Sequence, residues 1–362
     1  MALRDVEWQA CVLEPRRDRA VEQQVRRVFG AVPSAVPYFT PAPWVARSMA
    51  ALSDVGAPPL HLDHLLADLV TLVVSQDNSC RYCFAAQEVM MRVHGMPPAR
   101  IRQIEQDFLE AEIDPRSKAA LDFARRLSRA SPMVSAADAE PLRAVGWSVP
   151  AIKELSWHAA YSVYMNRLMT EAAIPPENPE RMADHWALGW IAPVARLVMR
   201  RRWRRPVPPT PLPPGAHAGP WSELVQAFDG LSVAPALRRA LDDAWASTLL
   251  PRRAKALAVA VIARGLGCAL GEREATRLAL VEGFPATEID GVLQHLGSPA
   301  LDPIEAALVP FARGTIRGRP AQLQQRTQVL QEILRPEQIV EVIGITGLAN
   351  ALCRIDVVTQ LA

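Results

Sequence analysis

The chain has 362 residues, half of them apolar, with 40 Lys and Arg against 38 Asp and Glu, so the formal net charge is only +2. This length allows two domains of ordinary size, and the near balance of charge gives no support to nucleic acid as a partner. Five cysteines are too few, and odd in number, for the disulfide framework of a small secreted protein.

The N-terminal segment MALRDVEWQACVLEPRRDRA is charged throughout, so we expect no signal peptide. No apolar run reaches the roughly 18 residues that a membrane span needs. The sequence therefore predicts a cytoplasmic protein, in which a CxxC motif is more often catalytic or metal-binding than structural.

Helical periodicity recurs along almost the whole chain, and prolines fall between the periodic segments. We predict an all-α fold. Its parts are an N-terminal extension (1–20), a CxxC-bearing domain (21–175), an apolar and basic segment with a Pro-rich linker (176–220), and a structural repeat of the first domain (221–362).

The first informative helix is expected over residues 61–76, with Asp63 near its start as a capping residue. Its polar side chains are spaced 3, 4, 3, 4 and form one stripe on an otherwise apolar helix; they are His61, His64, Asp68, Thr71 and Ser75. Such a stripe faces either solvent or an interior polar site, and solvent is the commoner case.

The next helix is expected within NSCRYCFAAQEVMMRVHG (78–95). Asp77, Asn78 and Ser79 come just before its first turn, and all three are good N-cap residues. Cys80 and Cys83 then lie in its first turn, where unpaired N–H groups and the helix dipole favour a thiolate. His94 lies about 16 Å beyond Cys83 along the axis. We therefore expect it at the helix C-terminus, out of reach of Cys83, with Gly95 as the cap.

Three interpretations of the CxxC motif remain open. The first is a redox dithiol, which needs a thiolate and a resolving thiol in reach. The second is a zinc site formed by His61, His64, Cys80 and Cys83. The third is a pair of cysteines that simply pack. We favour the redox dithiol.

Residues 185–205 are apolar with a basic end and are too short to cross a bilayer. This segment would either lie on an anionic membrane surface or dock on the first domain with its basic end in solvent, and we favour docking. The prolines between Pro206 and Pro214 predict an extended linker.

The two sides of this linker are similar to each other. A shift of 188 positions aligns Cys80 with Cys268 and gives 12 identities in 46 ungapped positions, where chance gives about three, which indicates an internal duplication. Further on, KELSWHAAYSVYMNRL (153–168) resembles VEVIGITGLANALCRI (340–355).

The second copy lacks the polar residues of the first. Asp68, Tyr82, Cys83 and Gln87 align with Ala256, Leu270, Gly271 and Ala275. We therefore expect the chemistry in the first half, and we interpret Cys11 and Cys353 as packing residues.

The stretch LVVSQDNSCRYCFAAQEVMMRVHGMPPARI resembles the core of the alkylhydroperoxidase D-like, or carboxymuconolactone decarboxylase-like, family. Shared features are the SQxNxCxYC start, which includes Tyr82, the small residues after Cys83 and the later Gly-Met-Pro. The resemblance covers residues 21–171. It implies an oligomerising all-α fold with thiol peroxidase or disulfide reductase activity at CxxC. It does not favour the decarboxylase branch, whose chemistry needs no vicinal dithiol.

Carried over residue by residue, the resemblance makes Cys83 the peroxide-attacking thiol, Cys80 the resolving thiol and Asp68 part of the proton relay. Gln87 stands where the peroxidase branch has a histidine, and it can hydrogen-bond but cannot take a proton. Activation would then fall to Asp68 or to His64.

The favoured hypothesis is a homo-oligomeric thiol-dependent peroxidase. Its substrate would be a hydroperoxide, its reductant a dithiol protein or small dithiol, and its redox group the CxxC disulfide, with no other cofactor. The alternatives are a non-catalytic helical scaffold or binding protein of the same fold, and the zinc site.

Overall fold

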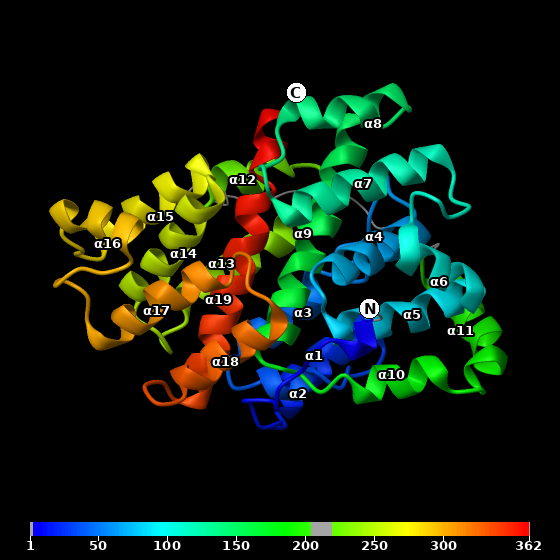
Figure 1. Ribbon diagram of the computed structural model, residues 1–362, viewed down its shortest axis with the longest axis horizontal. Helices are drawn as coiled ribbons and strands as arrows, with labels where there is room; N and C mark the ends of the chain where they lie inside the picture. The colour runs from blue at the N-terminus through cyan, green and yellow to red at the C-terminus, as the bar shows by residue number, and fades with distance from the viewer. Residues whose placement is uncertain (1–2, 204–218, 362) are drawn as a thin grey trace.

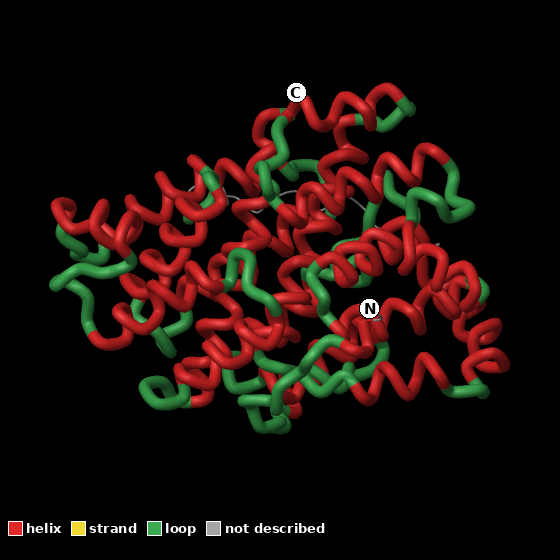
Figure 2. The backbone as a smooth tube through the Cα atoms, viewed as in Figure 1, coloured by secondary structure: helices red, strands yellow, loops and turns green. Residues whose placement is uncertain are grey.

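The computed structural model describes residues 3–203, here called the first part, and 219–361, the second part. Among these residues there are helices and loops but no β-strand, as Figure 2 shows. The predicted all-α class is therefore confirmed. The linker predicted at Pro206–Pro214 lies outside the described residues.

Figure 1 shows the helices in chain order from blue to red. The first part contains η1 (Leu3–Asp5), α1 (Arg19–Phe29), α2 (Val36–Phe39), α3 (Pro43–Ala51), α4 (His64–Asp77), α5 (Arg81–His94), α6 (Pro98–Asp107), α7 (Pro115–Arg129), η2 (Ala136–Ala139), α8 (Glu140–Ala144), α9 (Val149–Glu171), α10 (Glu177–Asp184) and α11 (Leu188–Trp203). The second part contains α12 (Ser222–Ala227), α13 (Val233–Ala246), α14 (Arg252–Leu266), α15 (Ala269–Val281), η3 (Ala286–Glu288), α16 (Ile289–His295), α17 (Pro303–Gly314), α18 (Pro320–Leu330), α19 (Pro336–Arg354) and η4 (Asp356–Gln360).

Helix α4 begins three residues later than the sequence pattern predicts. Asp63 is its N-cap, as expected, and accepts a hydrogen bond from the Leu66 N–H. The residues before it are held out of the helix because the Glu154 carboxylate accepts the backbone N–H groups of Leu60, His61 and Leu62. His61 therefore lies outside the helix, and the polar stripe begins at His64.

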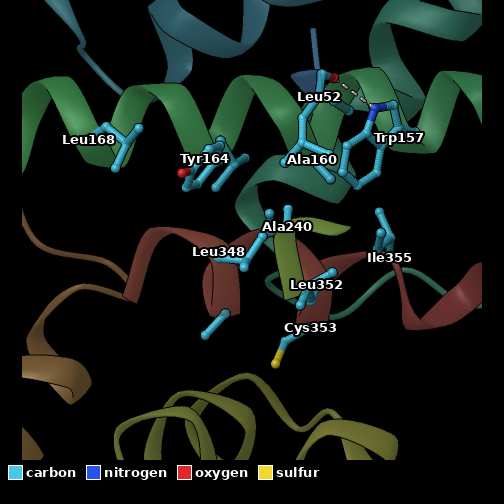
Figure 3. Close-up of a cluster of buried hydrophobic side chains, with 14 of the residues drawn as sticks. Leu52, Trp157, Ala160, Tyr164, Leu168, Ala240, Leu348, Leu352, Cys353 and Ile355 are labelled. Atoms are coloured by element: carbon cyan, nitrogen blue, oxygen red, sulfur yellow. Dashed lines mark hydrogen bonds between the residues drawn. The ribbon is translucent and has the colours of Figure 1, made fainter. Parts of the chain in front are cut away.

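The centre of the molecule is the contact between the two longest helices, α9 and α19, drawn green and red in Figure 1. In Figure 3, Ala160 and Tyr164 of α9 face Leu348 and Leu352 of α19 across a cluster of buried apolar side chains. The burial of this apolar surface is the main source of stabilisation at the centre.

The segment Pro336–Gln360, which contains α19, is long and apolar enough to cross a membrane by length and composition. The prediction that no stretch reaches this length was therefore wrong. Of its apolar 18-residue window, 89% is buried inside the protein, as expected for a core helix.

Helix α11 packs against α5 at the edge of the first part. The Arg196 guanidinium donates to the Val93 carbonyl at 2.7 Å, and Leu188 packs with Val89 and Ala183. These contacts dock the segment on the first part as far as residue 199, and the side chains of its basic end (200–205) lie outside the described residues. The opposite face of the segment leaves large apolar side chains exposed, among them Trp186, Trp190 and Val194.

Candidate dithiol site

Cys80 and Cys83 lie at the start of α5, as the sequence predicts, but the cap differs. Cys80 itself is the N-cap residue, whereas Asp77 ends α4, Asn78 caps that helix, and Ser79 adopts the left-handed conformation (φ 54°). The turn is closed by the Cys80 N–H, which donates to the Ser75 carbonyl at 2.9 Å. Both thiols are free and buried, Cys80 fully and Cys83 with 7% of its surface exposed.

The surroundings of the two sulfurs favour negative charge on Cys80. Burial raises the pKa of Cys80, but the Cys83 thiol and backbone N–H, the Thr170 hydroxyl and the Arg167 charge outweigh burial, and the pKa of Cys80 is lowered. Burial and the neighbouring Cys80 raise the pKa of Cys83 well above its ordinary value, against a hydrogen bond with Asn166. The environment therefore favours negative charge on Cys80 over Cys83, whereas the family resemblance had assigned the attacking thiol to Cys83.

The polar stripe of α4 faces the interior, against the long helix α9. The Ser162 hydroxyl donates to Thr71 Oγ1 at 3.0 Å, and one turn further the Asn166 amide donates to Ser75 Oγ at 3.0 Å. Because Asn166 also contacts Cys83, this ladder ends at the dithiol. The solvent-facing interpretation of the stripe was wrong.

Asp68 and His94 form a separate buried pair, with Nε2 and Oδ2 2.7 Å apart and each side chain 9% exposed. Burial raises the pKa of Asp68 to about 6, while the hydrogen bond with His94 opposes this shift. Asp68 lies seven residues before Ser75, or about 10 Å along α4. His94 ends α5 before the left-handed cap Gly95, as predicted, but its ring reaches back to α4 and binds the residue expected to serve Cys83.

Two further histidines, His64 and His158, make no recorded contact with the cysteines. His64 Nδ1 is 3.4 Å from Asp54 Oδ2, at the start of α4, whereas the cysteines follow the end of that helix. His158 is buried, and burial lowers its pKa to about 4, which keeps the ring neutral. Over residues 3–203 and 219–361, no group of three or more His, Cys, Asp or Glu has the geometry to hold a metal ion. His61, His64, Cys80 and Cys83 thus do not converge as a zinc ligand set.

The other two predicted site residues flank Cys83. Gln87 follows one turn later, and its buried Oε1 atom has no hydrogen-bond partner among the described residues. The Tyr82 hydroxyl lies 3.0 Å from Ser34 Oγ, in the loop before α2. Tyr82 is therefore bound to that loop and not to either sulfur.

Three residues of α9 interact with the sulfurs and were not predicted from the sequence: Asn166, Arg167 and Thr170. A signal was present, because polar side chains recur at every fourth position of this helix. They are His158, Ser162, Asn166 and Thr170, all buried. A four-residue polar repeat on a buried helix indicates an interior polar seam.

Arg167 also lines an open hollow beside the Cys80 turn, together with Ser79, Arg129, Arg317 and Arg354. The hollow joins the first part to the loop between α17 and α18. Its arginine side chains give a positive potential next to the thiolate position on Cys80.

No family model matches the sequence, and no curated protein matches it. Solved structures that are similar include an uncharacterized peroxidase-related protein from Ralstonia eutropha JMP134, described as an alkylhydroperoxidase AhpD core, with 24% identity, a TM-score of 0.41, and coverage of 49% of this chain and 98% of that one. Another uncharacterized peroxidase-related protein, from Silicibacter sp. TM1040, has 22% identity and a TM-score of 0.40, with coverage of 48% and 94%.

Proposed function

We propose that the chain is a thiol-dependent peroxidase in which Cys80 and Cys83 cycle between a dithiol and a disulfide. The observation that carries the proposal is the pair of free thiols at the start of α5, in contact with each other, with charge stabilised on one of them. A thiolate beside a second thiol is the minimum that reversible dithiol oxidation needs.

Cys83 is the better candidate for the attacking sulfur because it has some exposure, whereas Cys80 has none. A proton shift from Cys83 to Cys80 would leave a thiolate on Cys83, which the hydrogen bond with Asn166 favours. In this scheme Cys80 stores the negative charge in the resting state, and neither Asp68 nor His64 is needed to remove the proton from Cys83.

The reaction then proceeds in two steps. The Cys83 thiolate attacks the terminal oxygen of the hydroperoxide, the O–O bond breaks, and the alkoxide takes the proton from Cys80 to leave as the alcohol. Cys83 is now a sulfenic acid. The Cys80 thiolate attacks its sulfur, the S–S bond forms, and the hydroxide released becomes water on protonation. An external dithiol returns both thiols and is itself oxidised to a disulfide.

The test measures peroxide consumption with a dithiol reductant. Cys83→Ser and Cys80→Ser are each expected to lower turnover by at least about 100-fold, or 2.7 kcal/mol. Cys80→Ser should still give a sulfenic acid on Cys83, which a dimedone probe traps, and Cys83→Ser should not. Cys11→Ser is the matched control, because Cys11 is a half-buried lone thiol. Undiminished turnover in Cys83→Ser would sink the proposal.

A non-catalytic scaffold of the same fold is the second candidate. It is favoured by Gln87, which cannot accept a proton, and by the burial of both sulfurs. On this hypothesis, alkylation of Cys80 and Cys83 is slow at every pH at which the protein stays folded, and peroxide consumption does not exceed that of the double variant Cys80→Ser/Cys83→Ser.

A further inference from the structure

A second pair of thiols lies in the second part of the chain, at the start of α15. Cys268 is the N-cap of α15 with φ −84° and ψ 98°, against −84° and 95° at Cys80. Each cysteine follows a left-handed residue, Gly267 or Ser79, and each N–H donates to the carbonyl five residues earlier at 2.9 Å. The two turns therefore have the same backbone.

The second sulfur of this pair comes from a different helix. A Cβ atom placed on Gly271 would lie 2.9 Å from Cys268 Sγ and 3.0 Å from Cys353 Sγ of α19. Because Gly271 has no side chain, the Cys353 sulfur can occupy this space. Figure 3 shows this sulfur projecting from α19 away from α9.

The two thiol sites differ by an exchange between two positions. In the alignments given above, Gly271 takes the place of Cys83, and Cys353 takes the place of Asn166. In the first part, Asn166 contacts the sulfur of Cys83. In the second part, the cysteine has moved from the helix start to the long helix, and it contacts Cys268 from there.

We propose that Cys268 and Cys353 form a second redox couple that closes to a disulfide between the start of α15 and the end of α19. The sulfur of Cys268 accepts the Gly271 N–H at 3.2 Å, and such contacts at a helix start stabilise negative charge. The Gly271 position leaves no Cβ between the two sulfurs. This proposal departs from the interpretation of Cys353 as a packing residue.

The oxidant in this proposal is a small hydroperoxide such as hydrogen peroxide. One thiolate displaces hydroxide from it and becomes a sulfenic acid, and the other thiol then displaces the second hydroxide as the S–S bond forms. The two thiols lose two electrons and two protons in all, and the peroxide becomes two waters. Cys268 and Cys353 are 2% and 0% exposed, and the Cys268 thiol and burial raise the pKa of Cys353 well above its ordinary value. Oxidation is therefore expected to be slow and confined to small oxidants.

The experiment uses the full chain as Cys80→Ser/Cys83→Ser, which leaves only Cys11, Cys268 and Cys353. After treatment with hydrogen peroxide, the chain is denatured, alkylated and mapped by mass spectrometry. The expected product is a Cys268–Cys353 disulfide that a dithiol reverses, with Cys11 unpaired as the internal control. Recovery of both cysteines as free thiols, at peroxide concentrations that oxidise Cys11, would overturn the proposal. Because this variant lacks the first pair, the result does not depend on whether Cys80 and Cys83 turn over peroxide.

A second variant tests the exchange itself. In the same background, Gly271→Cys/Cys353→Asn rebuilds the helix-start motif. It is expected to form a disulfide between Cys268 and the introduced thiol at least about tenfold faster. The reciprocal change, Cys83→Gly/Asn166→Cys in the wild-type chain, should link Cys80 to the new cysteine on α9. If neither engineered pair closes while the variants remain helical by circular dichroism, the two sites are not equivalent and the inferred exchange between the two positions is wrong.

Discussion

The two central helices present different faces to their own neighbours. Toward α4, the helix α9 carries polar side chains that hydrogen-bond across the interface. At the positions of α19 that align with His158 and Ser162, the side chains are Ile345 and Ala349. These two residues line an apolar hollow whose other walls include Trp221, Trp245 and Val259.

The difference shows that the helical arrangement does not require the polar seam. A buried hydrogen-bonded pair contributes only about 1 kcal/mol net, but it costs more when one partner is removed. Apolar contacts tolerate exchange among side chains of similar size. Buried polar groups occur in the second part too, where the Asn350 amide donates to Thr315 and the Arg354 guanidinium donates to Asn350. What distinguishes the first part is the hydrogen-bonded seam between α9 and α4.

One polar feature is common to both helices, although its partner differs. Glu154 of α9 accepts three backbone N–H groups, whereas Glu341 of α19 pairs with Lys255, Nζ to Oε1 at 2.5 Å, with both side chains fully buried. Removing one member of a buried pair leaves an uncompensated charge.

Lys255→Met is therefore expected to give the largest loss of stability, about 3–5 kcal/mol. Glu154→Gln in the first part should cost less, about 1–3 kcal/mol, because its backbone partners are neutral. Urea unfolding followed by circular dichroism measures both. If the free energy of unfolding of Lys255→Met stays within about 1 kcal/mol of the wild-type value, this ranking of the two substitutions is wrong.

The start of α5 could be predicted because its signals are local: a CxxC motif, a turn before it and a glycine cap after it. The side chains that complete the site could not, because Asn166 lies 83 positions beyond Cys83 and meets it only when α9 packs on α4. The lowered pKa of Cys80 could not be predicted for the same reason, since Arg167 and Thr170, which contribute to it, belong to that distant helix.

The prediction that the second part carries no chemistry rested on the same kind of local evidence. The alignment showed Gly271 in place of Cys83, and this correctly indicated the loss of a CxxC motif. It could not show that Cys353, on another helix, fills the vacated space. A contact between residues far apart in the chain follows from packing and not from spacing.

The contact between the two central helices contains a pH-dependent group. Glu171 of α9 is fully buried and accepts the Thr346 hydroxyl of α19 at 2.9 Å. Burial raises its pKa to about 8, although Arg167 and Thr346 oppose this shift. A glutamate in an unfolded chain titrates near about 4.3, so between these values the folded protein holds a proton that the unfolded chain has released.

The free energy of unfolding should therefore fall as the pH rises through this window, by about 1.4 kcal/mol per pH unit. Glu171→Gln removes the titration, and between about pH 6 and 8 it should abolish roughly 2–3 kcal/mol of the decline. Urea midpoints measured across this range test the expectation. Parallel curves for variant and wild type would show that Glu171 stays ionised in the fold.

Two substitutions test which buried polar residue of the first part affects peroxide turnover, Asp68 or Asn166. Asp68→Asn weakens the pair with His94 and should cost about 1–2 kcal/mol of stability, but it should change peroxide turnover less than about threefold because Asp68 lies about 10 Å from the level of Cys83. Asn166→Ala removes the amide beside Cys83 and should lower turnover at least about tenfold, or 1.4 kcal/mol. The opposite ranking would restore Asp68 as a proton relay.

The smallest effect is expected at Tyr82, which the sequence motif places beside Cys83 and the structure joins to Ser34. Tyr82→Phe removes that hydrogen bond and should cost about 0.5–1 kcal/mol, with peroxide turnover unchanged. Ser34→Ala is the matched control, since a double-mutant cycle should assign the whole loss to this pair. A tenfold loss of turnover in Tyr82→Phe, with no such loss in Ser34→Ala, would mean that the hydroxyl serves the sulfurs when substrate is bound. The difference between the two parts of the chain would then extend to Leu270, which takes the place of Tyr82 at the start of α15 and carries no hydroxyl.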